Sequence, residues 1–330
     1  MPALARLALA VLLTVCGRVL AAQTPAASPT PKAPPPTRLA FASLVPEATF
    51  DLGGSRDFAA GDEAVWVLNR EAGALSRIDP QSNRVTQTIA VGPGGCAGLG
   101  AGFGAVLVPQ CAKKGIARID VKTNAAADPI PAALSDTARS IATGVGSVWV
   151  ISDAKGTIAR LDPLEKTAVA LIDTAPGAIA LAFGGDALWV ASSSGNLVSR
   201  VNPFTNLIVE TIPVPNHPRD IATGGGSVWT WNQGDGSVTR IDPKTNAIVT
   251  TIRIGAPVGA DARIAFGEGS VWVAGTALPL VRIDPRTNQV VQVFTGPGSP
   301  GLVIAHGSLW LAGSTKSVWR LDPRRIEATR

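Results

Sequence analysis

Residues 226–255 read GSVWTWNQGDGSVTRIDPKTNAIVTTIRIG, and versions of this stretch recur along most of the chain. Six copies carry a Trp in the Gly-x-Gly-Ser-Val-Trp-Val phrase, and Leu107 takes its place in a seventh: Trp66, Trp149, Trp189, Trp229, Trp272 and Trp310. Twelve or thirteen residues later comes Asp or Asn: Asp79, Asp120, Asp162, Asn202, Asp242, Asp284 and Asp322. An Arg stands two residues before each of these, with successive Arg 38 to 42 residues apart: Arg77, Arg118, Arg160, Arg200, Arg240, Arg282 and Arg320. Seven units of about 40 residues, each with several short strands, are typical of a β-propeller.

The four strands of one unit can be located in residues 219–254. We expect an inner strand at 219–223, a second at 227–231, a third at 237–241 and an outer strand at 247–254, joined by Gly-rich and Asp-Pro turns. The last unit ends early, because RRIEATR after Pro323 is a poor fourth strand. Residues 47–52 (EATFDL) match the outer strands of other units, so we expect them to pair with the last blade and close the ring. The predicted fold is an all-β, seven-bladed β-propeller over residues 39–330.

Composition and charge narrow the class of protein. Of 330 residues, 46% are hydrophobic and 16% are charged, which excludes a disordered chain. Only the N-terminus has a continuous apolar stretch, so a multi-span membrane protein is excluded. The net charge of +5 is small and dispersed, and no Lys/Arg tract is interleaved with aromatic residues, so nucleic acid is not the expected partner.

The N-terminus has the pattern of a secretory signal peptide over residues 1–22. Arg6 precedes the apolar run LALAVLLTV at 7–15, and small residues before Gln23 offer a cleavage site. A short membrane anchor and lipidation of Cys16 are the alternatives, but nine apolar residues are too few to span a bilayer and the β-branched Val15 disfavours lipidation. Residues 23–38 read as a Pro-rich linker. We therefore expect a periplasmic or secreted monomer with no membrane span after cleavage.

The repeats resemble the secreted propellers of the YncE-like and virginiamycin B lyase-like (streptogramin lyase) superfamily. The phrases that carry the resemblance are GSVWVISDAKGTIARLDP at 146–163, the stretch at 226–255 and GSVWVAGTALPLVRIDPRTNQVV at 269–291. The resemblance covers residues 45 to 323 and rests on scaffold residues, so it indicates the fold more than the function. A streptogramin lyase-like or lactonase-like enzyme and a DNA-binding propeller are the functions it leaves open.

The recurring residues have structural interpretations. One Trp per blade at a fixed position fits the widening gap between neighbouring sheets, and we expect Trp231 and Trp319, which lie outside that position, to pack or to lie at the rim. One Arg per blade is best explained as a repeated pair with carbonyls or carboxylates of an adjacent strand or blade. Cys96 and Cys111 fall opposite each other across the predicted hairpin of the second unit, so we predict a disulfide.

Catalytic and metal-binding patterns are weak. The streptogramin lyase resemblance implies a His general base with acidic and metal assistance, but His217 and His306 belong to loops on opposite faces of the predicted ring. No Gly-x-Ser-x-Gly motif is present, and the inner-strand starts do not offer the carboxylates of a calcium site. We therefore predict no catalytic residues, metal or cofactor.

The predicted binding site consists of Arg residues at the starts of inner strands. These are Arg56, Arg139, Arg219 and Arg263, with His217 beside one of them. Inner-strand starts converge on one mouth of the central channel, so these residues would attract an anionic small molecule or an acidic protein partner. The alternative is that each Arg pairs locally, as in Arg56 with Asp57 and Arg219 with Asp220, or with Asp136 and Asp261.

Overall fold

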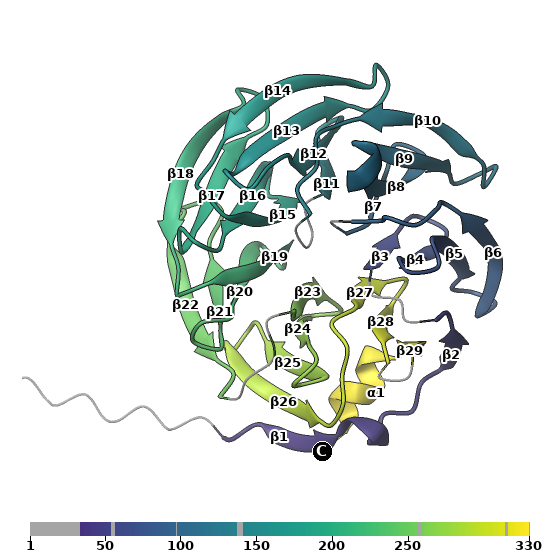
Figure 1. The fold of residues 1–330 in the computed structure, drawn as a ribbon. Helices are drawn as coiled ribbons and strands as arrows, with labels where there is room; N and C mark the ends of the chain where they lie inside the picture. Colours follow the sequence, from purple (N-terminus) through teal and green to yellow (C-terminus); the bar gives the residue numbers. More distant parts are fainter. Residues whose placement is uncertain are drawn as a thin grey trace, which may run out of the picture. The chain divides into compact units, whose positions relative to one another are not determined.

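The repeat period produces seven sheets arranged around a central axis. The computed structural model describes residues 34–53, 57–96, 98–136, 141–255, 259, 261–313 and 316–329. Within the unit Pro35–Arg330, each sheet has its inner strand at the axis and its outer strand at the rim, as Figure 1 shows. The predicted all-β, seven-bladed architecture is confirmed.

The first four blades follow one another directly along the chain. Blade 1 contains β3 (Asp57–Ala60), β4 (Val65–Asn69), β5 (Ala74–Asp79) and β6 (Arg84–Ala90). Blade 2 contains β7 (Gly100–Gly102), β8 (Ala105–Gln110), β9 (Gly115–Asp120) and β10 (Ala126–Pro131). Blade 3 contains β11 (Ile141–Gly144), β12 (Ser147–Ile151), β13 (Thr157–Asp162) and β14 (Thr167–Asp173). Blade 4 contains β15 (Ala178–Gly184), β16 (Ala187–Ser192), β17 (Leu197–Asn202) and β18 (Leu207–Pro213).

Blade 5 is also continuous along the chain, whereas blades 6 and 7 each include a strand from the N-terminal part of the chain. Blade 5 contains β19 (Pro218–Gly224), β20 (Ser227–Asn232), β21 (Ser237–Ile241) and β22 (Ile248–Arg253). Blade 6 contains β23 (Arg263–Gly267), β24 (Ser270–Ala274), β25 (Leu280–Asp284) and β26 (Gln289–Thr295), and β1 (Thr37–Ala40) is its fifth strand. Blade 7 contains β27 (Leu302–Ala305), β28 (Ser308–Ala312) and β29 (Ser317–Leu321), with β2 (Ala48–Asp51) as its outer strand.

Strand β2 closes the ring. It pairs antiparallel with β29, with Phe50 opposite Val318, so the predicted closure by the 47–52 segment is confirmed. The residues after Asp322 form the helix α1 (Pro323–Ala328) instead of a strand. Asp322 is its N-cap, accepting a hydrogen bond from the Arg324 N–H at 2.9 Å, and Pro323 occupies the first turn.

Blade 6 is covered at its rim by both ends of the described chain. Strand β1 begins at Thr37, within the predicted 23–38 linker, and pairs parallel with β26. The helix α1 lies against the same outer strand, where the buried Gln292 amide donates to the Ile326 carbonyl at 2.7 Å. Phe41, in the short 3-10 helix η1 (Phe41–Ser43), stacks on Trp319 with ring centroids 4.9 Å apart. The outer edge of β26 is therefore paired within the chain, and β1 becomes the edge strand of this blade.

The blade core is built around the recurring Trp residues. All six are at most 1% exposed, as is Trp231, which confirms the packing interpretation. In five blades the indole N–H also donates to the carbonyl five residues earlier, at 3.0–3.2 Å. These bonds are Trp149 to Gly144, Trp189 to Gly184, Trp229 to Gly224, Trp272 to Gly267 and Trp310 to Ala305.

The recurring Arg residues tie each blade to the next. Six guanidinium groups lie over the Trp of their own blade at 5.0–5.9 Å. Five also donate through Nη1 to an Asn in the following blade, at 2.7–3.2 Å: Arg77–Asn124, Arg160–Asn206, Arg200–Asn246, Arg240–Asn288 and Arg320–Asn83. The structural interpretation of the Arg series is therefore confirmed, with an amide oxygen as the main acceptor.

Blade 2 departs from this pattern. Leu107 stands where the other blades have Trp, and the position of the Asn acceptor in blade 3 is held by Lys166. Among the described residues, the buried Nε of Arg118 has no hydrogen-bond partner. Lys166 instead binds Asp128 on the outer strand of blade 2, with Nζ and Oδ2 2.6 Å apart. Among the described residues, the contact between blades 2 and 3 thus lacks the Arg-to-Asn hydrogen bond that joins five other pairs of blades.

The Asp of each Arg-x-Asp phrase shapes the turn that follows it. The Asp162 carboxylate accepts from the backbone N–H groups of Leu164 at 2.7 Å and Glu165 at 3.0 Å. These bonds hold the pKa of Asp162 below its ordinary value.

In the described part of the chain, no helix has the length and apolar character needed to cross a membrane.

Candidate functional site

The propeller has two distinct faces. Because every blade runs from its inner strand to its outer strand, all inner strands begin at the same face, which we call the start face. The hairpin turns that join the first and second strands of each blade lie at the opposite face, which we call the turn face. Arg219 and Arg263 lie near the beginnings of β19 and β23, so both belong to the start face.

A cavity of about 170 Å³ lies in the central channel among the inner strands. Arg263 is the one cation that lines it among the described residues, and Asp57 is the one carboxylate. The remaining lining residues are apolar or Gly: Phe58, Gly98, Leu99, Ile141, Leu181, Ala265, Leu302 and Val303. The cavity is therefore small, and the described residues around it include one charge of each sign among apolar side chains and Gly.

The strand register separates Arg263 from Arg219. Arg263 pairs with Ala274 and directly precedes Ile264, whereas the equivalent position of blade 5 is Asp220. Arg219 is the extra residue of a register shift between Pro218 and Asp220, and it is not among the residues that line the channel cavity. Blade 1 has Asp57 at the position of Arg263. Arg219 and Arg263 therefore both lie at the start of an inner strand but do not hold equivalent positions.

The carboxylates near the predicted site have specific partners. Asp57, which is 5% exposed, forms an ion pair with Arg70 from the loop after β4. Asp220 is fully buried and accepts a hydrogen bond from the Ile264 backbone N–H at 2.9 Å, which joins blade 5 to blade 6. Asp261 accepts from the Thr276 hydroxyl at 3.0 Å. Sequence reasoning missed Arg70, because the repeat does not align it with any other Arg.

Two predicted site residues, Arg56 and Arg139, lie outside the described residues. The predicted group of four Arg therefore remains a prediction for its first and third members. Of the two described members, the structure brings Arg263 to the channel cavity.

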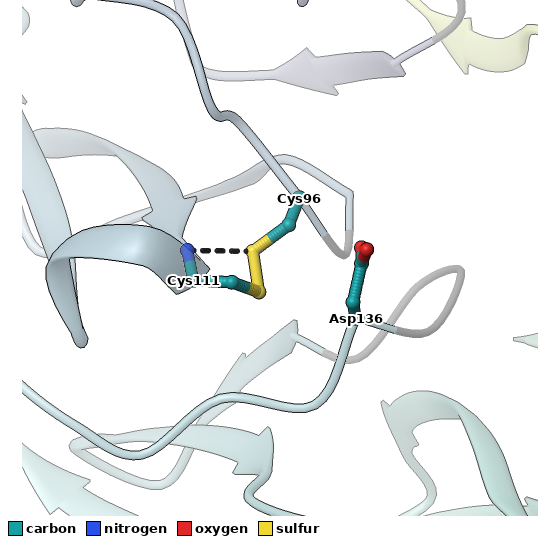
Figure 2. Close-up of side chains that lie close together, drawn as sticks. All are labelled: Cys96, Cys111 and Asp136. Atoms are coloured by element: carbon teal, nitrogen blue, oxygen red, sulfur yellow. Dashed lines mark hydrogen bonds between the residues drawn. A yellow bond between two sulfur atoms is a disulfide. The ribbon is translucent and has the colours of Figure 1, made fainter.

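The predicted disulfide is present. Cys96 and Cys111 are bonded, with their Cα atoms 5.9 Å apart. Cys96 lies before β7, not within it, and the Cys96 N–H donates to the Pro109 carbonyl at 3.0 Å. Figure 2 shows the Asp136 carboxylate beside the bridge, with its potential ligand atom within 4.8 Å of both sulfur atoms. Both sulfur atoms are used in the disulfide, so this group does not offer thiolate ligands to a metal.

The histidines are on opposite faces. His217 precedes β19 at the start face, is exposed, and donates its backbone N–H to the Asn196 side chain at 2.9 Å. His306 is exposed in the turn between β27 and β28, at the turn face. The two imidazoles therefore do not form one catalytic constellation.

Comparisons with known proteins agree with the architecture. The solved streptogramin B lyase structure matches with a TM-score of 0.68 and 21% identity, over 82% of this chain and 94% of that chain. The fold is that of the streptogramin lyases. A catalytically inactive variant of virginiamycin B lyase from Staphylococcus aureus, solved with quinupristin, matches with a TM-score of 0.69 and 17% identity over 82% of this chain and 98% of the other. BamB from Moraxella catarrhalis matches less closely, with a TM-score of 0.58 and 13% identity over 80% of this chain and 83% of the other.

Sequence comparison adds little about function. Residues 222–317 match a family described as a repeat of unknown function (DUF6923). No curated protein sequence matches the chain significantly. Identities of this size to solved structures establish a shared fold and leave the chemistry to the site itself.

Proposed function

We propose that this protein is an exported, non-enzymatic propeller that binds a small anion at the start face of its central channel. The observation that carries the proposal is the position of Arg263, which lines the channel cavity where blades 1 and 5 have Asp. Asp57, the carboxylate of the same cavity, is ion-paired with Arg70. Arg70, which does not line the cavity, therefore offsets the negative charge of Asp57.

The size of the cavity limits the ligand. A volume of about 170 Å³ is below that of pockets for drug-sized molecules, so a small anion with a short apolar part fits better than a peptide. A guanidinium in a partly enclosed cavity favours a carboxylate or phosphate group, because charge-assisted hydrogen bonds are stronger there than in water. The disulfide supports the exported location, since such bonds persist in oxidising compartments.

A streptogramin lyase-like reaction is the alternative suggested by the structural neighbours. The separation of His217 and His306 onto different faces argues against a shared catalytic site. Incubation of the purified protein with quinupristin tests this alternative, and we expect no turnover above a no-protein control.

A thermal-shift screen of the mature protein with phosphate, acetate, succinate and citrate tests the binding proposal. We expect at least one anion to raise the melting temperature, because a ligand that binds only the folded state stabilises it. The shift should be lost in Arg263→Gln and kept in Arg286→Gln, which changes a guanidinium of the same blade that is 82% exposed at the turn face. Equal shifts in both variants would contradict the proposal.

A further inference from the structure

The seams between blades at the turn face are filled in a regular way. The next-to-last residue of an inner strand packs over the Gly that ends the previous inner strand. Phe183 lies so close to Gly144 that a Cβ built there would come within 2.3 Å of its ring, and Phe266 approaches Gly224 to the same distance. Thr143, Thr223 and Ile304 fill the same position over Gly102, Gly184 and Gly267.

The seam between blades 1 and 2 is not filled. The register of β7 places Ala101 at the filling position, where its methyl group is smaller than the Thr, Ile and Phe side chains named above. A Cβ built at Gly61 would meet no atom nearer than the Trp66 indole nitrogen, at 4.0 Å. A cavity of about 320 Å³ occupies this seam, which is within the size range of small-molecule sites. We call it the seam pocket.

Two hydrogen-bond donors that are paired in most other blades have no partner among the described residues at the seam pocket. The Trp66 indole N–H makes no hydrogen bond to any described residue, although the five other Trp in this series each donate to a turn carbonyl. The Arg77 Nε also has no hydrogen-bond partner among the described residues, because Ala64 stands where four other blades have Ser. In blades 3, 5, 6 and 7 that Ser hydroxyl accepts from the Arg Nε at 2.8–2.9 Å.

The neighbouring seam, between blades 7 and 1, shows that a small filling residue alone does not free these donors. Ala60 holds the filling position there. Nevertheless, the Trp310 indole donates to the Ala305 carbonyl at 3.1 Å, and the Arg320 Nε donates to the Ser308 hydroxyl at 2.9 Å. At the seam pocket, by contrast, an unfilled cavity lies beside two donors that have no hydrogen-bond partner among the described residues.

The charges around the seam pocket indicate the class of ligand. Arg77 and Lys122 supply positive charge, and Asp62 and Glu63 supply negative charge. The Glu63 carboxylate lies 3.5 Å from the Arg77 Nη2 and is 82% exposed, so it is available at the rim. Phe103, which is 40% exposed, adds an apolar surface. A purely anionic ligand would be repelled by the two carboxylates, whereas a zwitterion satisfies both sets of charges.

We infer that the seam pocket binds a small zwitterion of the amino-acid type with an apolar side chain. Its carboxylate accepts from the Trp66 indole N–H and the Arg77 guanidinium, and its ammonium group faces Asp62 and Glu63. This site lies at the turn face and is separate from the channel cavity that contains Arg263. The inference therefore does not depend on the proposed function.

Isothermal titration with three matched probes tests the inference: L-phenylalanine, 3-phenylpropanoate and 2-phenylethylamine. L-phenylalanine should bind the wild-type protein with a Kd of about 1 mM or tighter, and each probe that lacks one charge should bind at least about tenfold more weakly. Failure of L-phenylalanine to bind, or equal binding of all three probes, would overturn the inference.

Four variants locate the binding. Ala101→Phe places the filler of blades 4 and 6 in the seam pocket and should abolish binding, and Ala101→Thr, which copies blades 3 and 5, serves if the larger side chain prevents folding. Ala64→Ser gives Arg77 its usual acceptor and should weaken binding about fivefold. Ala187→Ser makes the same change in blade 4 and should leave the Kd unchanged. Binding that persists unchanged in both Ala101 variants would place the ligand elsewhere and refute the site.

Discussion

The Arg contacts between blades predict that two residues at the same repeat position differ sharply in their effect on stability. Arg240 donates to the Ser227 hydroxyl at 2.9 Å, to the Pro285 carbonyl at 2.7 Å and to the Asn288 amide oxygen at 2.9 Å. Its guanidinium also lies 5.0 Å from the Trp229 ring centroid. Each hydrogen bond contributes roughly 1 kcal/mol net, so Arg240→Met should lower the free energy of unfolding by about 3 kcal/mol.

Arg118 is the internal control for this experiment. Its blade has Leu107 for Trp and Ala105 for Ser, and the next blade has Lys166 for Asn. The buried Arg118 Nε has no hydrogen-bond partner among the described residues, so Arg118→Met removes a desolvated donor without breaking a bond of that atom. We expect Arg118→Met to change stability by less than about 1 kcal/mol, in either direction.

Urea unfolding followed by tryptophan fluorescence measures the free energy of unfolding of both variants, and thermal unfolding gives their melting temperatures. Because unfolding entropy is about 2.1 cal/mol/K per residue, a loss of 3 kcal/mol corresponds to a fall in melting temperature of roughly 5 °C for a domain of this size. A similar loss in both variants would show that the Arg series acts through its charge or its aliphatic stem instead of through the specific contacts to the next blade.

Three further predictions concern the disulfide, the turns and the N-terminal segment. Replacing Cys96 and Cys111 by Ala should cost about 3 kcal/mol, the loop-closure value for a sequence separation of 15, and the unreduced wild-type protein should show no free thiol after denaturation. Two titratable thiols would contradict the bond. The lowered pKa of Asp162 means that its contribution to stability is complete well above its ordinary value of 3.8 and is lost as the pH falls through the lower folded-state value. Asp162→Asn, which copies Asn202 of the next blade, should therefore lose less stability between pH 5 and pH 3 than the wild type, and parallel profiles would refute this. Phe41→Ala should lower the free energy of unfolding by about 3 kcal/mol, because Phe41 is 3% exposed, and an unchanged urea midpoint would show that β1 and η1 are dispensable.

The ring of blades could be predicted because its signals repeat. The Trp, Arg and Asp positions recur at a fixed spacing, and the missing outer strand of the last unit could be matched to residues 47–52 by its pattern. The additions at the rim of blade 6 have no such support. TRLA at 37–40 resembles no repeat strand, and Asp322-Pro323 matches the turn phrase of the other units as well as it matches a helix N-terminus. Tertiary packing of Ile326 and Gln292 decides that ambiguity in favour of the helix.

The candidate site was less accessible to sequence reasoning. The strand starts could be assigned to one face, but Arg219 stands one residue before Asp220, which holds the position in β19 that Arg263 occupies in β23. The difference is visible in the spacing to the recurring Trp of each unit, because Arg56, Arg139 and Arg219 precede it by ten residues and Arg263 precedes it by nine. The Asn acceptors did leave a signal, because Asn recurs four residues after the Asp or Asn of the Arg-x-Asp/Asn phrase in five blades. That signal predicts a contact only once the neighbouring blade is placed in space.

Titration calorimetry of the anion that gives the largest thermal shift, into the wild-type protein and Arg263→Gln, is the most direct test of binding in the channel. We predict a single site in the wild-type protein and at least about tenfold weaker binding in Arg263→Gln, since a hydrogen bond to a charged group contributes roughly 1.5–3 kcal/mol. Affinity should also fall between 50 mM and 500 mM salt as screening increases. An unchanged Kd in Arg263→Gln would contradict the account and place the anion outside the channel.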